Sequence, residues 1–284
     1  MHLNMLRMVS DLRVASDFLP ESVFIVYGFL CCREEKSTYD AAFNGKFLKF
    51  DLLMKHVLLP DAGQRSLPFF LAMEEYVAGK YDGEAFFVWR VAPTVIIGRN
   101  QVLENEVNME YCRERGVDVV RRRSGGGCVY SDKGNIMVSY ISRRGDVAEV
   151  FERYLSALTE ALRSLGLPAE RTGRNDVLVD GRKVSGNAFH MLPDRSIVHG
   201  TLLYSTDLEA MTEAIRPPVE KLQRHGVESV RQRVMNISEL VESMDEPHEA
   251  LRSVEALEKY LVGYFTDGEI ALEDDDVVKI NNMI

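Results

Sequence analysis

The stretch NDVLVDGRKVSGNAF, residues 175–189, constrains the fold strongly. Two runs of alternating apolar and polar residues flank Asp180-Gly181, a dipeptide that is typical of the two-residue turn of a β-hairpin. We therefore expect two antiparallel strands here. Gly186 falls inside the second run, and a glycine within a strand marks a bulge or a close approach by another group.

The sequence on either side of this hairpin predicts further strands and helices in mixed order. Residues 146–166 have helical periodicity with an Asp start and a Gly stop, which predicts a long amphipathic helix. Shorter helices are expected at 105–116 and 248–265. Strands are expected at 85–91, 94–99, 117–123, 135–141 and 199–205. The expected fold is α/β (α+β), with mixed, largely antiparallel sheets flanked by helices, and not the regular βα alternation of a doubly wound fold.

A helix is also expected directly after Ser66, which can serve as its N-cap. The helical spacing is interpreted as placing Glu74 and Glu75 on the solvent side. The apolar face of this helix is expected to contain Leu67, Phe70, Leu71 and Val77.

The composition is that of an ordinary globular protein. Of 284 residues, 46% are hydrophobic and 27% are charged, and the formal net charge is −10. This acidic balance argues against a nucleic-acid binder, which would carry a basic domain. The apolar run at 18–32 contains Glu21 and is too short to span a membrane, so we expect a cytoplasmic protein that does not associate with membranes. Reduced thiols are expected at Cys31, Cys32, Cys112 and Cys128.

Residues 1–53 look unlike the rest, and Met54 begins the first clear strand. Two explanations stay open for them: an N-terminal extension that comes from a misplaced start, or an appendage that packs on the domain. Residues 54–284 are expected to form a single domain. The acidic tail that begins at Leu272 is too short to form another domain.

The stretch RRRSGGGCVYSDKGN, residues 121–135, places three arginines next to three glycines. Consecutive glycines let the backbone approach a ligand and can aim several N–H groups at one anion. Arginines supply fixed charge and forked donors for a carboxylate or a phosphate, and Ser124 and Ser131 add neutral donors. This pattern favours a phosphate or carboxylate pocket over the alternative of a flexible turn with solvated arginines. It is not a P-loop, because no Gly-Lys-Ser/Thr follows and the next element is a strand.

Asp176 and Lys183 fall on the two paired strands of the hairpin, where cross-strand neighbours lie a few ångströms apart. An acid and a cation in this arrangement suit a metal–phosphate contact and a charge neutraliser, and an ordinary surface ion pair is the alternative. Gly186 shortly after the lysine favours the first interpretation. His199 begins a later strand and is assigned to pocket shape, not to acid–base chemistry.

Together, and in this order, these motifs resemble those of lipoate–protein ligase A and its relatives. Further matching blocks are FFLAMEEYV at 69–77, FFVWRVAPTVIIGRNQ at 86–101, HGTLLYSTDL at 199–208 and KLQRHGVESVRQRVMNI at 221–237. The likeness covers residues 55–265. It implies the catalytic fold that this family shares with biotin protein ligases and class II aminoacyl-tRNA synthetases.

The resemblance implies an ATP-dependent ligase. Members use ATP and Mg²⁺ to convert lipoate to lipoyl-AMP, and then transfer the lipoyl group to a carrier lysine. The implied partners are the lipoyl domains of 2-oxoacid dehydrogenase E2 subunits and the glycine cleavage H protein. Lys183 would contact the adenylate phosphate and the lipoate carboxyl, Asp176 would face the nucleotide through Mg²⁺, and Arg122 and His199 would contact lipoate. The wall of the ATP and lipoyl-AMP pocket would contain Arg121, Arg122, Ser124, Gly125, Gly126, Gly127, Cys128, Val129, Tyr130 and Asn135.

The sequence departs from the family pattern in three respects. Ser131 stands where a histidine is usual, and Cys128 stands where an alanine is usual. The small C-terminal accessory domain of full-length ligases has no counterpart in the sequence, so a separate accessory subunit is an expected partner. Alternatives that stay open are a lipoyl or octanoyl transferase that uses a preformed activated acyl group, the catalytic half of a two-subunit ligase, and a lipoyl- or nucleotide-binding module. An acyl-cysteine transferase is disfavoured, because RTGRND before the hairpin contains no cysteine.

Overall fold

The computed structural model describes residues 54–143, 145–172, 175–215 and 233–284. All of the described residues belong to one unit of the chain, Asp51–Ile284. The predictions for residues 1–53, and for most of the block at 221–237, lie outside the described residues.

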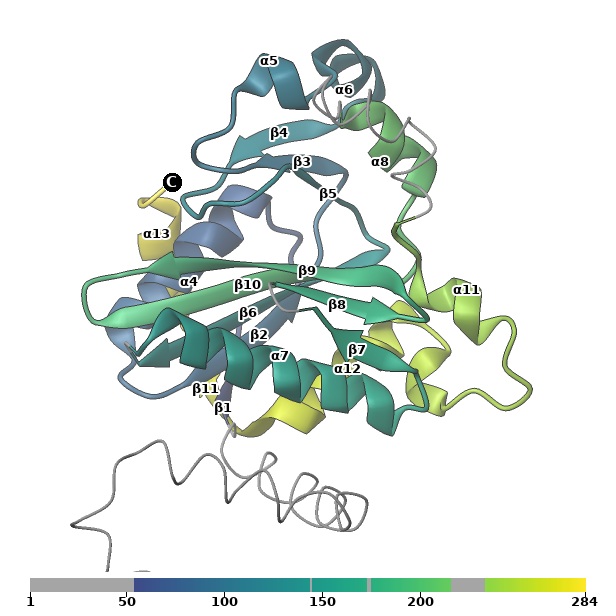
Figure 1. Ribbon diagram of the computed structural model, residues 1–284. Coiled ribbons are helices and arrows are strands. Elements are labelled where there is room, and N and C mark those ends of the chain that lie inside the picture. The colour runs from purple at the N-terminus through teal and green to yellow at the C-terminus, as the bar shows by residue number, and fades with distance from the viewer. Residues whose placement is uncertain (1–53, 144, 173–174, 216–232) are drawn as a thin grey trace, which may run out of the picture. The chain divides into compact units, whose positions relative to one another are not determined.

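The described residues form an eight-stranded sheet in the order β11-β1-β2-β6-β10-β9-β8-β7 (Figure 1). β1 is parallel to both of its neighbours, and the other pairs are antiparallel. The prediction of a mixed, largely antiparallel sheet is confirmed. The strands are β1 (Met54–Leu58), β2 (Ala85–Trp89), β6 (Asn135–Arg143), β7 (Ala169–Arg171), β8 (Asp176–Val179), β9 (Arg182–Met191), β10 (Arg195–Leu203) and β11 (Thr266–Ala271).

The hairpin of β8 and β9 forms as predicted. Asp180 and Gly181 both have a positive φ, 50° and 71°, which is the conformation that a two-residue turn of this kind requires. A Cβ at Gly186 would lie 2.7 Å from Nζ of Lys183. This glycine therefore makes room for the lysine side chain, which is the close approach that the sequence indicated.

Two helices, α7 (Val147–Ser164) and α12 (Val254–Phe265), cover one face of this sheet (Figure 1). α7 is the predicted long helix, and the Asp146 side chain caps it by accepting hydrogen bonds from two N–H groups of its first turn. The second predicted helix begins as a separate 3-10 turn, η1 (Glu249–Leu251), before α12. Apolar side chains of both helices pack with those of the strands in one core.

On the opposite face lie the helix α4 (Leu67–Lys80) and a second, three-stranded sheet of order β4-β3-β5. Its strands are β3 (Thr94–Ile97), β4 (Asp118–Arg121) and β5 (Val129–Ser131). The connection from β2 to β3 is short, as predicted, yet it carries the chain from the large sheet to the small one. The small sheet packs against α6 (Met109–Arg115), which ends at Gly116 with a φ of 66°, and against α8 (Leu208–Ala214). The remaining helices are α5 (Leu103–Glu106) and α11 (Ile237–Val241).

The prediction for α4 is right in position and wrong for one residue. The helix begins after Ser66, although the serine side chain makes no capping hydrogen bond. Glu75 is half-buried, but Glu74 is only 2% exposed and not on the solvent side. Glu74 faces the large sheet because it hydrogen-bonds to Ser139 and His199 there.

The C-terminal residues add two elements that join the sheet and α4. β11 pairs with β1, which was not predicted. After it, α13 (Asp274–Asn281) lies against α4. The Asp276 carboxylate accepts hydrogen bonds from the Tyr76 hydroxyl at 2.5 Å and from Lys80 Nζ at 2.6 Å. These bonds hold α13 on α4.

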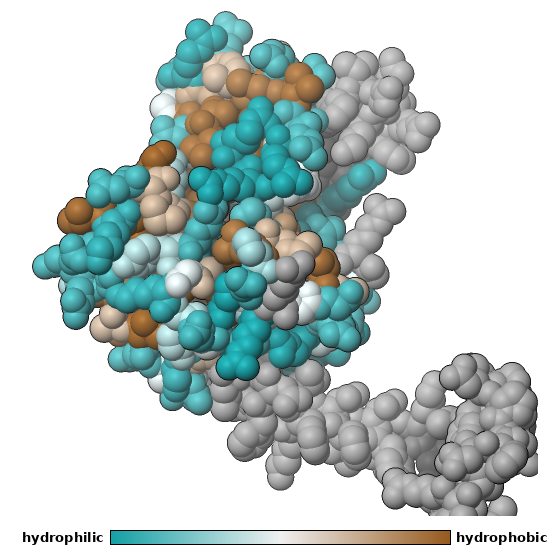
Figure 2. Space-filling view, turned by 90° about the vertical axis from the view of Figure 1, so that its left-hand side faces the viewer, coloured by the Kyte–Doolittle hydropathy of each residue, from teal (hydrophilic) through white to brown (hydrophobic). Residues whose placement is uncertain are grey.

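The described part of the chain contains no helix with the length and apolar character that a membrane span needs. The face in Figure 2 is largely hydrophilic, with separate hydrophobic patches. The large hydrophobic side chains that are exposed among the described residues are Val102, Val147, Met191, Val278, Met283 and Ile284.

Candidate active site

A cavity of about 120 Å³ lies between the two sheets. Leu67 and Leu71 of α4 line one side of it, and the small sheet contributes Ile96 and Val129. The large sheet contributes Met137, Lys183, Gly186, Ala188, His199, Gly200 and Thr201. We call this cavity the α4 lobe, and its lining is mainly apolar.

A second cavity of about 200 Å³ adjoins the first and is lined by Met211 and Thr212 of α8. We call it the α8 lobe. The two lobes share the lining residues Cys128, Val129, Lys183, Gly186 and Thr201. Lys183 therefore lies where the two lobes meet.

Lys183 is paired with the acid that the sequence placed opposite it. Its Nζ lies 2.8 Å from Oδ1 of Asp176, and about a third of each side chain is exposed. The main chain of Lys183 pairs with the segment around Val234. Its N–H donates to the carbonyl of Arg233 at 2.7 Å, and its carbonyl accepts from the N–H of Met235 at 3.0 Å. The strand thus presents a fixed cation and a partner carboxylate at the junction of the lobes.

Arg122 is 5% exposed and binds the glycine loop, residues 124–128. Its Nη2 donates to the carbonyl oxygens of Gly125 at 2.7 Å and Gly127 at 2.8 Å, and its Nη1 donates to that of Ile96 at 3.2 Å. Its Nε donates to Oγ of Ser124 at 3.0 Å. Burial lowers the pKa of this guanidinium, but an arginine keeps its charge in a protein. Arg122 therefore acts as a clamp that shapes the loop.

The glycine loop packs closely against the small sheet. A Cβ at Gly98 would lie 2.1 Å from the carbonyl oxygen of Gly126, and Gly126 has a φ of 98°, which glycine adopts readily. None of the described residues accepts a hydrogen bond from the N–H of Gly125, Gly126 or Gly127. The clamp on the carbonyls therefore leaves a set of N–H donors for an anion.

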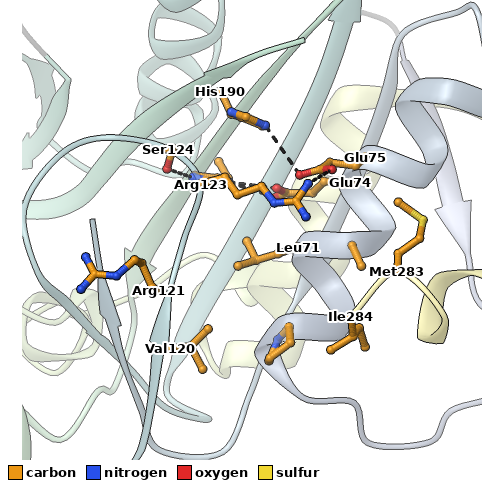
Figure 3. A pocket seen from close by; sticks show the side chains of 13 residues that line it. Leu71, Glu74, Glu75, Val120, Arg121, Arg123, Ser124, His190, Met283 and Ile284 are labelled. Carbon is orange, nitrogen blue, oxygen red and sulfur yellow. Dashed lines mark hydrogen bonds and ion pairs between the residues drawn. The ribbon is translucent and has the colours of Figure 1, made fainter. Parts of the chain in front are cut away.

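The three consecutive arginines diverge. Arg121 donates through Nη1 to the carbonyls of Gly98 at 2.9 Å and Gln101 at 2.8 Å. Arg123 pairs with Glu75 of α4 (Figure 3). Arg121 and Arg123 line a third cavity of about 190 Å³, which shares Leu71 and His199 with the α4 lobe. Only Arg122 of the three lines the α4 lobe.

Residues 67–261 match a family model described as the lipoyl protein ligase A/B catalytic domain. The chain belongs to this family. The matched range includes the glycine loop, the β8–β9 hairpin and His199, all of which contribute to the two lobes.

Relatives in this family are similar over the same region. The chain is 41% identical over 175 residues to lipoate-protein ligase LplJ of Bacillus subtilis. This alignment covers 61% of this chain and 53% of that protein. It is 38% identical over 216 residues to lipoate–protein ligase 1 of Staphylococcus aureus, with 75% and 65% covered. It thus spans between half and two thirds of the length of these curated relatives.

A solved structure has a similar fold. It is described as a bi-partite lipoate protein ligase from Thermoplasma acidophilum, studied with its E2 lipoyl domain. The two chains are 26% identical with a TM-score of 0.67, and the match covers 82% of this chain and 92% of that one. The likeness therefore extends across nearly the whole of the solved chain.

Four residues that the family resemblance places in the nucleotide wall lie outside the linings of both lobes: Arg121, Ser124, Gly125 and Asn135. Asn135 is fully buried in β6, where its Nδ2 donates to Oγ of Ser131 at 3.0 Å. Ser131 stands where the family usually has a histidine, and it is fully buried too. This bond uses the Asn135 amide nitrogen, while the buried Oδ1 of Asn135 has no hydrogen-bond partner among the described residues.

Tyr130 and Cys128 do line the lobes. Burial raises the pKa of the Tyr130 hydroxyl. Burial, with a smaller effect of Glu106, raises the pKa of the Cys128 thiol to about 12. Because the thiolate is the nucleophilic form, Cys128 is a poor nucleophile at neutral pH.

Sequence reasoning missed Glu74, which the fold brings to His199. Glu74 Oε2 lies 2.9 Å from His199 Nδ1, and His199 Nε2 lies 2.7 Å from Ser124 Oγ. A signal was available, because Glu74 follows Leu67 by seven residues and Phe70 by four. That spacing places it on the buried stripe of α4.

Proposed function

We propose that this chain catalyses the ATP-dependent activation of lipoate to lipoyl-AMP and the transfer of the lipoyl group to a lysine of a carrier domain. One observation carries the proposal: Lys183, a cation, lies where an apolar lobe meets a second lobe. The glycine loop that lines the first lobe has N–H groups that are available to bind an anion. An acyl-adenylate has matching parts: an acyl chain for one lobe, a nucleotide for the other, and an acyl-phosphate group between them that would lie at Lys183. The identities to named lipoate–protein ligases support this proposal.

The α4 lobe suits the acyl chain. Leu67, Leu71, Ile96 and Met137 line it with apolar side chains, and burial of apolar surface stabilises a bound hydrocarbon by about 25 cal/mol per Å². The carboxylate of lipoate would then lie near Lys183. His199 and Arg122 also line this lobe, and they would belong to the polar part of the lipoate site.

The α8 lobe suits the nucleotide, with Val129, Tyr130 and Met211 as its apolar lining. The N–H groups of Gly126 and Gly127 would bind its phosphate, in the way that backbone donors bind anions elsewhere. Mg²⁺ would enter with ATP. Among the described residues no three metal-binding side chains lie together, and the single carboxylate of Asp176 fits an ion that substrate phosphates hold for the most part.

The first step joins two anions, so its barrier depends on positive charge. The carboxylate of lipoate attacks the α-phosphorus of ATP, an acyl-phosphate bond forms, and pyrophosphate leaves. Lys183 and the loop N–H groups stabilise the charge that develops on the phosphate oxygens. Asp176 holds the Lys183 ammonium in place at 2.8 Å.

In the second step the amine of a carrier lysine attacks the acyl carbon of the mixed anhydride. An amide forms, AMP leaves, and Lys183 stabilises the departing phosphate. No covalent enzyme intermediate is needed, and the high pKa of Cys128 argues against an acyl-cysteine route. We propose lipoyl domains of E2 subunits as carriers, as for the Thermoplasma acidophilum ligase, and the H protein as a second carrier.

The test is a comparison of acyl donors with the purified chain and a lipoyl domain. Lipoate with Mg-ATP, preformed lipoyl-adenylate and an octanoyl acyl-carrier-protein thioester are supplied separately, and acylation of the domain is followed by intact mass. Modification with lipoate and Mg-ATP supports the proposal. Modification with lipoyl-adenylate alone identifies the chain as the transferring half of a two-part ligase, and modification with the thioester alone replaces the proposal with an acyl transferase. No modification with any donor leaves a binding module.

A further inference from the structure

A buried line of hydrogen bonds crosses from the glycine loop to α4, and we call it the relay. Arg122 Nε donates to Ser124 Oγ at 3.0 Å, and Ser124 Oγ lies 2.7 Å from His199 Nε2. His199 Nδ1 lies 2.9 Å from Glu74 Oε2, and Ser139 Oγ donates to Glu74 Oε1 at 2.6 Å. All five side chains are buried.

With Glu74 ionised and His199 neutral, these groups fit one arrangement of protons. An ionised Glu74 can only accept, so His199 carries a proton on Nδ1 and donates it to Glu74. A neutral His199 then accepts through Nε2, which makes Ser124 the donor in that bond. Ser124 in turn accepts from Arg122, which can only donate.

The other end of the relay is fixed in the same way. The indole Nε1–H of Trp89 donates to Ser139 Oγ at 2.9 Å, so the Ser139 hydroxyl is turned toward Glu74. The Glu74 carboxylate thus has a donor for each oxygen although it is 2% exposed. A buried carboxylate is costly unless it is bonded in this way.

We propose that Glu74 is a positioning residue for the glycine loop. It holds His199 in the tautomer with the proton on Nδ1, and His199 then orients Ser124 so that its oxygen accepts from Arg122. Arg122 is the group that clamps the carbonyls of Gly125 and Gly127. Glu74 therefore sets the place of the loop N–H donors although it lines neither lobe. It lines the third cavity, which shares Leu71 and His199 with the α4 lobe.

The neighbouring residue provides a matched control. Glu75 is the next residue of α4 and also pairs with an arginine of the same stretch, but this partner, Arg123, has 67% of its side chain exposed. Glu75→Gln removes the same charge from the same helix and leaves the relay intact. Any effect of Glu74→Gln that Glu75→Gln lacks belongs to the relay.

The first measurement is the tautomer of His199 by ¹⁵N NMR of histidine-labelled full-length chain, without substrates and above neutral pH. The wild type is expected to carry the proton on Nδ1, and so is Glu75→Gln. In Glu74→Gln the Nδ1–H population is expected to fall. A wild-type His199 with its proton on Nε2 would overturn the proposal, even if no variant could be purified. The signal is assigned by its shift in Ser124→Ala, which removes the partner of Nε2.

The second measurement is the rate of lipoyl-adenylate formation, and this part rests on the proposed function. Glu74→Gln is expected to lower kcat/KM about tenfold or more, the cost of a buried hydrogen bond to a charged group. Glu75→Gln should stay within about twofold, because the arginine that it pairs with is mostly exposed. Glu74→Gln combined with Ser124→Ala should be no worse than the more impaired single variant, because both break one relay.

The two measurements separate this proposal from the proposed function. A wild-type chain without ligase activity sinks the function, while the tautomer still decides the relay. Equal losses in Glu74→Gln and Glu75→Gln, or additive losses in the double variant, overturn the positioning role. Equal activity of Glu74→Gln and the wild type overturns it as well.

Discussion

Two consecutive arginines are linked to two consecutive glutamates of α4, one pair through buried side chains and the other by direct contact. Arg122 is buried and reaches Glu74 through Ser124 and His199. Arg123 is mostly exposed and pairs with its glutamate directly, at the edge of a surface cavity (Figure 3). The same charges therefore have different roles: the buried line fixes a loop, whereas an exposed pair contributes about 0–1 kcal/mol to stability.

Lys183 adds a third case to this comparison, because it neither holds the loop nor forms a surface ion pair; its proposed role is to stabilise charge on the substrate. Lys183→Ala is expected to lower the rate of lipoyl transfer by about 10² to 10³, as for the loss of one donor to a developing charge. Its melting temperature should change little, because the side chain is a third exposed. The matched control is Arg182→Ala on the same strand, whose exposed side chain pairs with Glu239. Full activity of Lys183→Ala would contradict the assigned mechanism.

Arg122→Lys tests whether the fork of the buried arginine, and not its charge, holds the loop. A lysine keeps the charge but cannot bind Ile96, Gly125 and Gly127 together. We expect the free energy of unfolding to fall by about 3 kcal/mol, and adenylate formation to fall with it. Urea denaturation measures the first quantity, and a loss below about 1 kcal/mol would show that the clamp is dispensable.

Asp276 tests whether a carboxylate outside the relay stabilises the fold through its hydrogen bonds. The N–H of its own helix turn at Glu273, and then Lys80 and Tyr76, hold its pKa below the ordinary range. A depressed pKa stabilises the fold above the unfolded value near 4, and this contribution is lost as the pH falls through the folded value. Asp276→Asn should therefore lower the melting temperature at neutral pH by several degrees, for a loss of about 1.5 kcal/mol, and less at acid pH. A difference that does not shrink on acidification would refute this.

The smallest effect is expected at the exposed pair. Arg123→Ala should change the free energy of unfolding by less than about 1 kcal/mol, and added salt should remove most of the difference. Urea titrations of Arg123→Ala and Arg122→Lys under the same conditions compare the losses of unfolding free energy at the two arginines directly. Comparable losses in the two variants would erase the distinction drawn here.

Much of the site was predictable because its signals are local. The turn at Asp180-Gly181 has a conformation that those residues favour, and it places Asp176 and Lys183 on paired strands. The glycine run predicts a close approach of the backbone to a ligand, which stays a prediction, and within the chain Gly126 does approach Gly98 closely. In each of these cases the spacing along the chain nearly determined the geometry.

The parts that were not predicted depend on distant contacts. The directions of the three arginines are set by carbonyls and acids from other segments, so adjacency in sequence suggested a convergence that the fold does not produce. Glu74 was placed in solvent because its charge outweighed its position on the apolar stripe. β11 alternates half-buried and exposed residues at a sheet edge and pairs with β1, far away in sequence, so its pairing left no local signal.

The most direct test of the central claim is calorimetric titration of the chain with a sulfamate analogue of lipoyl-adenylate, in which sulfamate replaces the phosphate. The account predicts one molecule bound per chain, with an affinity far above those of lipoate and AMP measured alone, because the two lobes meet at Lys183. Lys183→Ala should weaken this binding. An analogue that binds no more tightly than lipoate would contradict the claim that the two lobes form one acyl-adenylate site.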